Sequence, residues 1–394
     1  MNRVKNPYSP GAGAPPPALV GRQQPLEDMD VALQRRLIGR SAKGIMLTGR
    51  RGVGKTVLLA EFASRAVGFG YVHEHIEAGD GMDFAREVAS AVRRVLLQLE
   101  ARQRQPIARA ARAQVQRALG VLKAFSVRLP QGPEFTLEVA AVPGPADSGD
   151  LAIDLAGLLR ETGEAARALS AGVLITLDEL QYLAPQDLAA LIVGMHRVEQ
   201  VSLPIQVAGA GLPSLPGLLG EVRSYVERMF TFVDIGALSP PDIAEALSRP
   251  AWDEGVDWAD EAILRVAEAS EGYPYFLQEF GKTSWDVAPG PSHIGLEDVM
   301  QAIPVAEAEL DGSFFRVRFD RTTDSERAYL RAMAHLGPGP HATAQVAKAM
   351  RRTVQQVGSV RDSLIHRGLC FAPRWGQIDF TVPMFDGFLR RALN

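Results

Sequence analysis

The chain has 394 residues, of which 46% are apolar and 22% are charged, and its formal net charge at pH 7 is −4. This composition is typical of a globular protein and excludes disorder over the whole chain. A single cysteine, Cys370, excludes a disulfide framework and a site with four cysteine ligands. No apolar run is long enough to span a membrane, and the first 22 residues lack the apolar stretch of a signal peptide. We therefore expect a soluble cytoplasmic protein of two or three domains with no membrane partner.

The charge is distributed unevenly along the chain. Residues 316–394 carry a formal charge of +7, and the remainder carries −11. Such asymmetry often separates an enzymatic part from a part that binds nucleic acid. An arginine-rich solvated surface would account for it equally well at this point.

The first half of the chain alternates predicted helices with short apolar strands. Residues 6–17 are rich in proline and glycine and are expected to be extended. Helices are predicted at 24–40, 56–66, 82–104, 107–124, 151–169, 186–201 and 214–228, and strands at 44–48, 71–76, 173–177, 205–208 and 230–235. A hairpin is expected from the alternating residues 125–129 and 135–139. Strands that alternate with helices indicate an α/β fold with a doubly wound parallel sheet.

Three regions follow from this pattern. Residues 1–237 are expected to form the α/β core, with a helical and hairpin insert at about 93–142. Residues 238–315, in which we find only helices from 240 to 310, are expected to form a lid. Residues 316–394 are expected to form a separate C-terminal domain.

A glycine-rich stretch after the first strand matches G-x-x-x-x-G-K-[ST], the pattern of a phosphate-binding loop. The glycines let successive backbone N–H groups surround phosphate oxygens, and the next helix directs its N-terminus at the same anion. Lys55 is expected to reach the outer phosphates and Thr56 to bind Mg²⁺. The candidate nucleotide-binding residues of this stretch are Gly49, Arg50, Arg51, Gly52, Val53, Gly54, Lys55, Thr56 and Val57.

The apolar strand at 173–177 ends in Asp178-Glu179. Asp178 is expected to hold Mg²⁺ through water, and Glu179 is placed to act as a general base on the attacking water. About 120 residues after a phosphate-binding loop in an α/β pattern, these carboxylates favour hydrolysis over simple nucleotide binding. We therefore predict an ATPase with Lys55 and Glu179 as catalytic residues.

The phosphate-binding loop, the Asp178-Glu179-Leu180-Gln181 stretch and Val20-Gly21-Arg22 together resemble an AAA+ ATPase. The resemblance is greatest to the group that contains archaeal-type ATPases, origin-recognition initiators and STAND-class NTPases. It implies ATP or ADP as ligand, Mg²⁺ as cofactor, and a base pocket formed partly by Val20, Gly21 and Arg22. It also implies that Pro274, in a Gly-Tyr-Pro sequence similar to the STAND lid motif, packs near the nucleotide; a plain turn before a helix is the alternative.

Two departures from the family pattern concern hydrolysis. Gly209-Ala210-Gly211 stands where a polar sensor residue is usual, and Pro274 and Tyr275 stand where a lid arginine is expected. Both favour slow or partner-stimulated hydrolysis. Arg228 matches the position of an arginine finger that reaches a neighbour's nucleotide, which would require a homo-oligomer. Local pairing of Arg228 with Glu227 or Glu221 is the alternative.

The C-terminal domain is predicted to be a winged helix-turn-helix. Helices at 324–336, 343–350 and 353–366 precede a hairpin formed by 369–372 and 378–381. We expect one face of the third helix and the tip of the wing to contact double-stranded DNA. The candidate DNA-binding residues are Arg352, Gln356, Ser359, Ser363 and Arg374. A winged helix that binds a protein partner is the alternative.

Three hypotheses for function follow. The chain is an ATPase that couples nucleotide state to DNA binding, a STAND-like switch acting through a protein partner, or a regulator of DNA remodelling or transposition. The insert at 93–128 carries nine basic residues and one acidic residue, which suits either an acidic partner or a solvated helix face.

Overall fold

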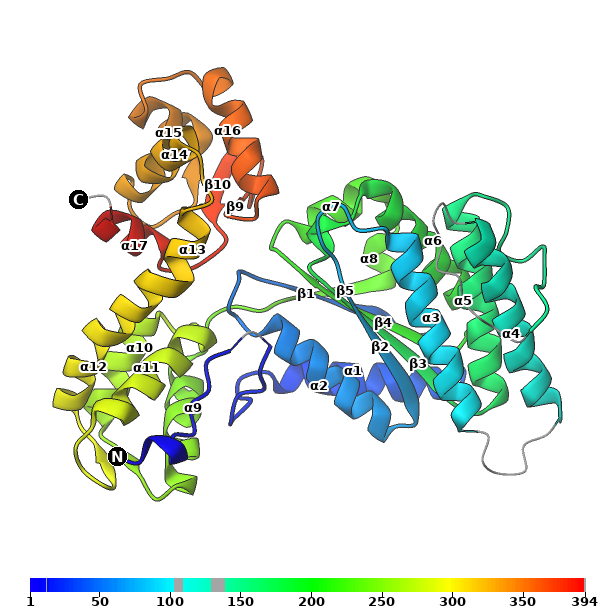
Figure 1. Cartoon of the computed structure of the whole chain (residues 1–394), viewed down its shortest axis with the longest axis horizontal. Helices are drawn as coiled ribbons and strands as arrows, with labels where there is room; N and C mark the ends of the chain where they lie inside the picture. The colour runs from blue at the N-terminus through cyan, green and yellow to red at the C-terminus, as the bar shows by residue number, and fades with distance from the viewer. Residues whose placement is uncertain (12, 103–108, 129–138, 393–394) are drawn as a thin grey trace.

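The computed structural model describes residues 1–11, 13–102, 109–128 and 139–392 (Figure 1). Within these residues, the strands β1 (Gly44–Thr48), β2 (Tyr71–Glu77), β3 (Gly172–Asp178), β4 (Ile205–Gly211) and β5 (Phe230–Asp234) form a parallel sheet. Their spatial order is β2-β3-β4-β1-β5. The predicted α/β fold with a parallel sheet is confirmed.

Helices cover both faces of this sheet (Figure 1). On one face lie α1 (Gln23–Leu37) and α2 (Lys55–Gly68). On the other lie α3 (Phe84–Ala101), α5 (Leu151–Ala168) and α6 (Pro185–Gln200), with α4 (Arg109–Arg128) packed outside them. Because both faces are covered, β3 and β4 are buried at every position, which explains their mostly apolar sequences.

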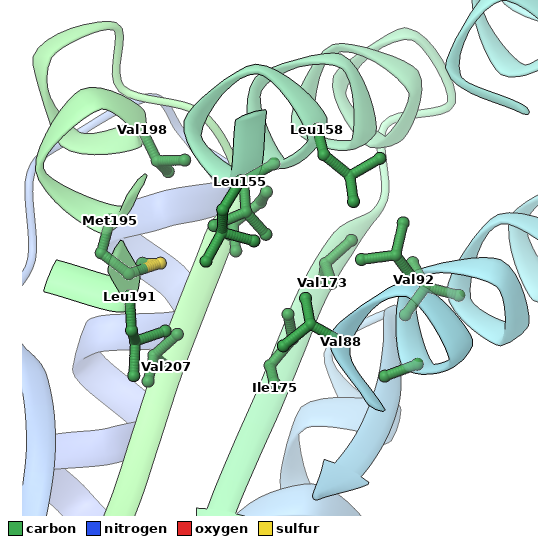
Figure 2. Close-up of a cluster of buried hydrophobic side chains, with 14 of the residues drawn as sticks. Val88, Val92, Leu155, Leu158, Val173, Ile175, Leu191, Met195, Val198 and Val207 are labelled. Atoms are coloured by element: carbon green, nitrogen blue, oxygen red, sulfur yellow. The ribbon is translucent and has the colours of Figure 1, made fainter. Parts of the chain in front are cut away.

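The largest cluster of buried side chains joins the sheet to the second helix layer (Figure 2). Alternate residues of β3, Val173 and Ile175, face Val88 and Val92 of α3 and Leu155 of α5. Burial of such side chains stabilises the fold by about 1.5–3 kcal/mol each. The core therefore holds the carboxyl ends of the strands, where both candidate motifs begin, on a rigid support.

Some predicted elements differ from the observed ones. Residues 125–128 belong to α4 rather than to a strand, and residues 129–138 lie outside the described part of the chain. The helix predicted at 214–228 is interrupted and forms α7 (Leu215–Val222) and α8 (Val226–Met229). Alternation in 125–129 indicated a strand, but α4 continues to Arg128 with Phe125 buried in the core.

The lid follows the sheet and consists mainly of α9 (Pro240–Asp253), α10 (Asp260–Ser270), α11 (Pro274–Val287) and α12 (Leu296–Glu309). The prediction of helices alone was incomplete, since β6 (Asp257–Trp258) pairs with β7 (His293–Ile294). The N-terminal segment lies along the lid, where the Tyr8 ring meets Trp258 and Trp285 edge-on. Trp258 Nε1 also donates to the Tyr8 hydroxyl over 2.8 Å.

A π-helical turn (Leu310–Phe315) and α13 (Arg316–Phe319) connect the lid to the C-terminal domain. This domain contains α14 (Asp324–His335), α15 (Thr343–Ala349) and α16 (Val354–His366). The predicted hairpin is present as β9 (Cys370–Phe371) and β10 (Gln377–Phe380), and β8 (His341–Ala342) extends it into an antiparallel sheet. The sequence analysis did not predict β8 or α17 (Phe385–Ala392). Among the described residues, no helix combines the length and hydropathy needed to cross a membrane.

Candidate functional site

The loop between β1 and α2 has the backbone shape that its glycines predict. Gly52 and Gly54 have positive φ angles of 83° and 93°, a conformation that favours glycine. A Cβ atom at Gly49 would lie 2.3 Å from the Ile235 carbonyl oxygen. Any side chain at position 49 would therefore separate the loop from the end of β5.

Lys55 begins α2 and is 8% exposed. Its Nζ donates to the carbonyl oxygens of Gly49 (2.8 Å) and Arg50 (2.9 Å). Burial lowers the pKa of Lys55 to about 8, although Glu179 and Asp178 act in the opposite direction. An anion in the loop would favour the charged form of this lysine.

Thr56 and Asp178 meet at the carboxyl edge of the sheet. The Thr56 Oγ1 donates to Asp178 Oδ2 over 2.6 Å, across 122 positions of sequence. Asp178 also accepts from the Glu179 backbone N–H over 2.8 Å. A hydroxyl and a carboxylate are oxygen ligands of the kind that Mg²⁺ prefers, so this pair fits the predicted metal.

Glu179 follows β3 in a left-handed conformation, with a φ of 54°. Its carboxylate accepts a hydrogen bond from Gln181 Nε2 and lies 3.4 Å from Arg51 Nη1. Gln181 Oε1 in turn accepts from the Leu212 N–H, just past β4, over 3.0 Å. Gln181 thus connects the end of β4, which carries only Gly209-Ala210-Gly211, to the candidate base. The sequence analysis quoted Gln181 in its motif but gave it no role.

These groups open into a cavity of about 540 Å³, a volume in the usual range for small-molecule sites. The core, the lid, the N-terminal segment and the connection to the C-terminal domain all contribute to its walls. The predicted residues that line it are Val20, Arg22, Arg51, Gly52, Val53, Gly54, Lys55, Thr56, Val57, Asp178, Glu179 and Pro274. Ser9, Gly13, Tyr275, Gln278 and Arg318 also line it and were not predicted.

Val20, Gly21 and Arg22 lie between the core and the lid. Arg22 Nη2 donates to the Gly236 carbonyl oxygen over 2.7 Å and approaches that of Val53 at 3.4 Å. Gly21 does not line the cavity; a Cβ at this position would lie 2.7 Å from Asp242 Oδ2 of α9. Only Val20 and Arg22 of the three are therefore available to a ligand.

The start of α11 lies directly on the phosphate-binding loop. Pro274 is the first residue of the helix, where its missing N–H leaves no hydrogen bond unmade. The next N–H, that of Tyr275, donates to the Gly52 carbonyl oxygen over 3.2 Å. The lid is thus attached to the loop through its backbone.

The C-terminal domain also contacts this loop. The Arg51 N–H donates to the Thr381 carbonyl oxygen over 2.8 Å, and Arg51 Nη2 donates to the Tyr182 hydroxyl over 2.8 Å. Arg50 forms a salt bridge with Asp379 of β10. Arg50, predicted to bind nucleotide, does not line the cavity, and neither does Gly49. The Arg50 side chain instead joins the core to the C-terminal domain.

Arg228 lies outside the cavity. It precedes β5, whereas the phosphate-binding loop follows β1, and the two strands are parallel. Five residues of strand separate the two edges by about 15 Å. Arg228 is exposed, and within the described residues it forms no ion pair with Glu227 or Glu221. It is therefore remote from the site of its own chain.

The predicted DNA-binding residues are only partly free. Arg352 precedes α16, and Gln356 Oε1 accepts from the Thr353 N–H over 2.9 Å as part of the helix cap. Ser363 Oγ donates to Glu326 Oε1 over 2.6 Å. Ser359 and Arg374 are exposed, and Arg374 lies in the loop between β9 and β10, where the wing tip was predicted. The shared face predicted from spacing is therefore partly used to build the domain itself.

The arginine-rich insert is largely tied to the core. Arg94 pairs with Glu74 at 2.5 Å, and Arg117 pairs with Glu161 at 2.8 Å. Arg102 donates to the carbonyl oxygens of Gly70 and Tyr71 over 2.6 Å and 2.7 Å. These contacts account for part of its charge without an external partner.

The fold of this chain is similar to those of proteins whose structures have been solved. The structure of the Walker-type ATPase PABY2304 of Pyrococcus abyssi aligns with a TM-score of 0.58 and 16% identity, over 94% of this chain and 96% of that one. The Orc1 protein of Aeropyrum pernix in complex with DNA aligns with a TM-score of 0.49 and 15% identity, over 98% and 96%. At these identities the likeness concerns the fold alone. A comparison with curated protein sequences finds no significant match.

Two family models match parts of the chain. Residues 312–389 match a domain of unknown function (DUF8462). Residues 18–207 match the AAA ATPase domain, and this region contains the phosphate-binding loop, Asp178 and Glu179. The predicted resemblance is confirmed: residues 18–207 form an AAA ATPase domain.

Proposed function

We propose that the chain binds Mg²⁺-ATP in the cavity between core and lid, hydrolyses it slowly, and uses the nucleotide state to position its C-terminal domain. The observation that carries this proposal is the convergence of Lys55, Thr56, Asp178 and Glu179 on one cavity of suitable size. They come from two distant parts of the AAA ATPase domain.

Each residue has a separate part in the proposed reaction. Backbone N–H groups of the loop and the Lys55 ammonium bind the phosphates. Thr56 and Asp178 hold Mg²⁺, which neutralises charge on the phosphate oxygens when bound. Glu179 orients the attacking water and accepts its proton. Gln181 sets the orientation of the Glu179 carboxylate from the end of β4.

Slow hydrolysis is supported by the surroundings of Glu179. Its carboxylate accepts a hydrogen bond from Gln181 and lies beside Arg51. Both contacts restrict rotation of the carboxylate toward an attacking water molecule. A partner that moves Arg51 would then increase the rate.

DNA binding by the C-terminal domain is the finer part of the proposal. Its positive charge, the exposed Arg352 and Ser359, and the wing tip support it. At that tip Trp375 is fully exposed beside Arg374, which suits contact with a phosphate backbone and an apolar or aromatic surface. Attachment of this domain to the phosphate-binding loop provides the route from nucleotide to DNA.

A STAND-like switch remains the second candidate function. It is favoured by the contacts of Arg50 and Arg51 with Asp379 and Thr381, because a nucleotide that displaces the loop would release the domain. In that case the released surface would bind a protein rather than DNA. Because Arg228 is exposed and remote from the site of its own chain, a role as an arginine finger would require a second copy of the chain.

The ATPase rate at low salt, with and without double-stranded DNA, tests the proposal. Wild type is compared with Glu179→Gln and with Glu221→Gln, an exposed control outside the cavity. We expect Glu179→Gln to reduce the rate at least about 100-fold, as loss of a general base does, and Glu221→Gln to leave it unchanged. DNA stimulation would support the DNA-coupled function. A negligible wild-type rate that DNA does not change would contradict the DNA-coupled ATPase and favour the STAND-like switch.

A further inference from the structure

The cavity contains a cationic side chain from outside the AAA ATPase domain. Lys55, Arg22 and Arg51 belong to that domain, whereas Arg318 comes from α13, in the connection to the C-terminal domain. Arg318 is half-buried and lines the same cavity as Glu179. Arg318 lies well outside the sequence around Pro274 and Tyr275, where the family pattern places a lid arginine.

The surroundings of Arg318 hold its side chain in place without neutralising it. Its Nη1 donates to the Phe314 carbonyl oxygen over 2.6 Å, and its guanidinium lies 4.0 Å from the centre of the Phe314 ring. Among the described residues it has no carboxylate within ion-pair distance. Burial lowers the pKa of Arg318, and the positive charges of Arg51 and Arg321 act in the same direction. Tyr275 is the group that acts against them.

Such a cation is stabilised by an anion. A half-buried guanidinium near a second arginine favours a ligand with several negative oxygens, and the planar guanidinium matches the geometry of a phosphate group. The neighbouring Arg51 lies 3.4 Å from the candidate base Glu179. Arg318 packs on Phe314, which stacks on Tyr275 beside Gly52, so Arg318 lies on the side of the cavity formed with the phosphate-binding loop.

We propose that Arg318 binds the terminal phosphate of ATP and so distinguishes ATP from ADP. This proposal rests on the proposed nucleotide function of the cavity. It assigns the ATP-sensing cation of this chain to the segment between lid and C-terminal domain. The C-terminal domain would then be drawn toward the nucleotide only while the third phosphate is present.

The structure contains a direct connection for this effect. Phe314, on which Arg318 lies, stacks on Tyr275 with ring centres 4.8 Å apart. The Tyr275 N–H in turn donates to Gly52 of the phosphate-binding loop. Phe314 belongs to the π-helical turn Leu310–Phe315, and π-turns within helices frequently occur at functional sites. A change in the position of Arg318 would therefore shift contacts of the lid, the phosphate-binding loop and α13 together.

Isothermal titration of the full chain with ADP and with a non-hydrolysable imido analogue of ATP, both with Mg²⁺, tests this proposal. We expect Arg318→Ala to weaken binding of the analogue at least about tenfold and that of ADP less than about twofold, since one charge-assisted contact is lost. Arg316→Ala is the matched control, because Arg316 lies on the same short helix, is exposed and does not line the cavity. It should change neither affinity.

Arg318→Lys provides a second variant that keeps the charge and an apolar stem on Phe314. We expect an intermediate, analogue-selective loss. Equal losses for both nucleotides, or an Arg318→Ala variant that binds both like Arg316→Ala, would overturn the proposal. Circular dichroism shows whether Arg318→Ala is folded. If it is not, Arg318→Lys replaces it, and binding of both nucleotides by Arg318→Lys with wild-type affinity would overturn the proposal. Failure of the wild type to bind either nucleotide would instead overturn the proposed function itself.

Discussion

The phosphate-binding loop and the face of α16 were both predicted from short patterns of residues, but their side chains have different surroundings in the structure. Around the loop, Lys55, Thr56, Asp178 and Glu179 converge on one cavity. On α16, Gln356 caps its own helix and Ser363 bonds to Glu326. The residues of the first pattern line one cavity. Two residues of the second pattern form hydrogen bonds within the C-terminal domain instead.

The difference lies in what each pattern constrains. The loop works mainly through backbone N–H groups whose directions follow from glycine conformations and from a buried strand. The α16 pattern relies on short polar side chains, and such side chains readily bond to nearby backbone and carboxylate groups. A motif of the backbone is therefore a stronger predictor of function than a stripe of polar residues on a helix.

Among the substitutions that test this comparison, removal of the Lys55 ammonium should have the largest effect on affinity. Lys55→Ala is expected to weaken Mg²⁺-ATP binding at least about 100-fold, since contacts of a buried charge with phosphate are lost. Titration calorimetry measures this, with the exposed Lys43→Ala as the control. ATP binding that survives Lys55→Ala intact would mean that the loop is not the nucleotide site.

The pH dependence of binding gives a smaller, graded effect. Burial lowers the pKa of Lys55 to about 8 in the ligand-free site, so the charged form that phosphate requires becomes scarce above this pH. We expect the ATP affinity to fall roughly tenfold between pH 7 and pH 9, following the protonated fraction. The Lys55→Arg variant, which keeps its charge in this range, should bind with little pH dependence. A flat wild-type profile would contradict the role of Lys55 burial.

The smallest expected effect concerns the α16 face. Arg352→Ala should weaken binding to double-stranded DNA about two- to fivefold and reduce the salt dependence of affinity by about one counterion. Ser363→Ala should lower the melting temperature with little change in DNA affinity, since its hydroxyl bonds to Glu326. Fluorescence anisotropy over a salt series measures both affinities. Equal effects of the two substitutions on DNA binding would mean that the α16 residues act as one face after all.

Several residues that line the cavity could not be predicted from the sequence. The N-terminal segment near Ser9, Gln278 of α11 and Arg318 of α13 all line it, yet they lie far from either motif in the chain. None of them belongs to a local pattern with a known chemical meaning. Gln181 was within a quoted motif, but its bond to the end of β4 depends on the strand order.

The sequence by itself determined most of the helices and strands, the parallel sheet and the phosphate-binding loop, because hydrophobic periodicity and glycine conformations act over a few residues. It also placed Asp178 and Glu179 at the end of a buried strand. Only the tertiary structure decided that Arg50 pairs with Asp379 and that Arg318 lines the cavity. These outcomes depend on how lid and C-terminal domain pack on the core, and contacts between residues hundreds of positions apart leave no periodic trace in a single sequence.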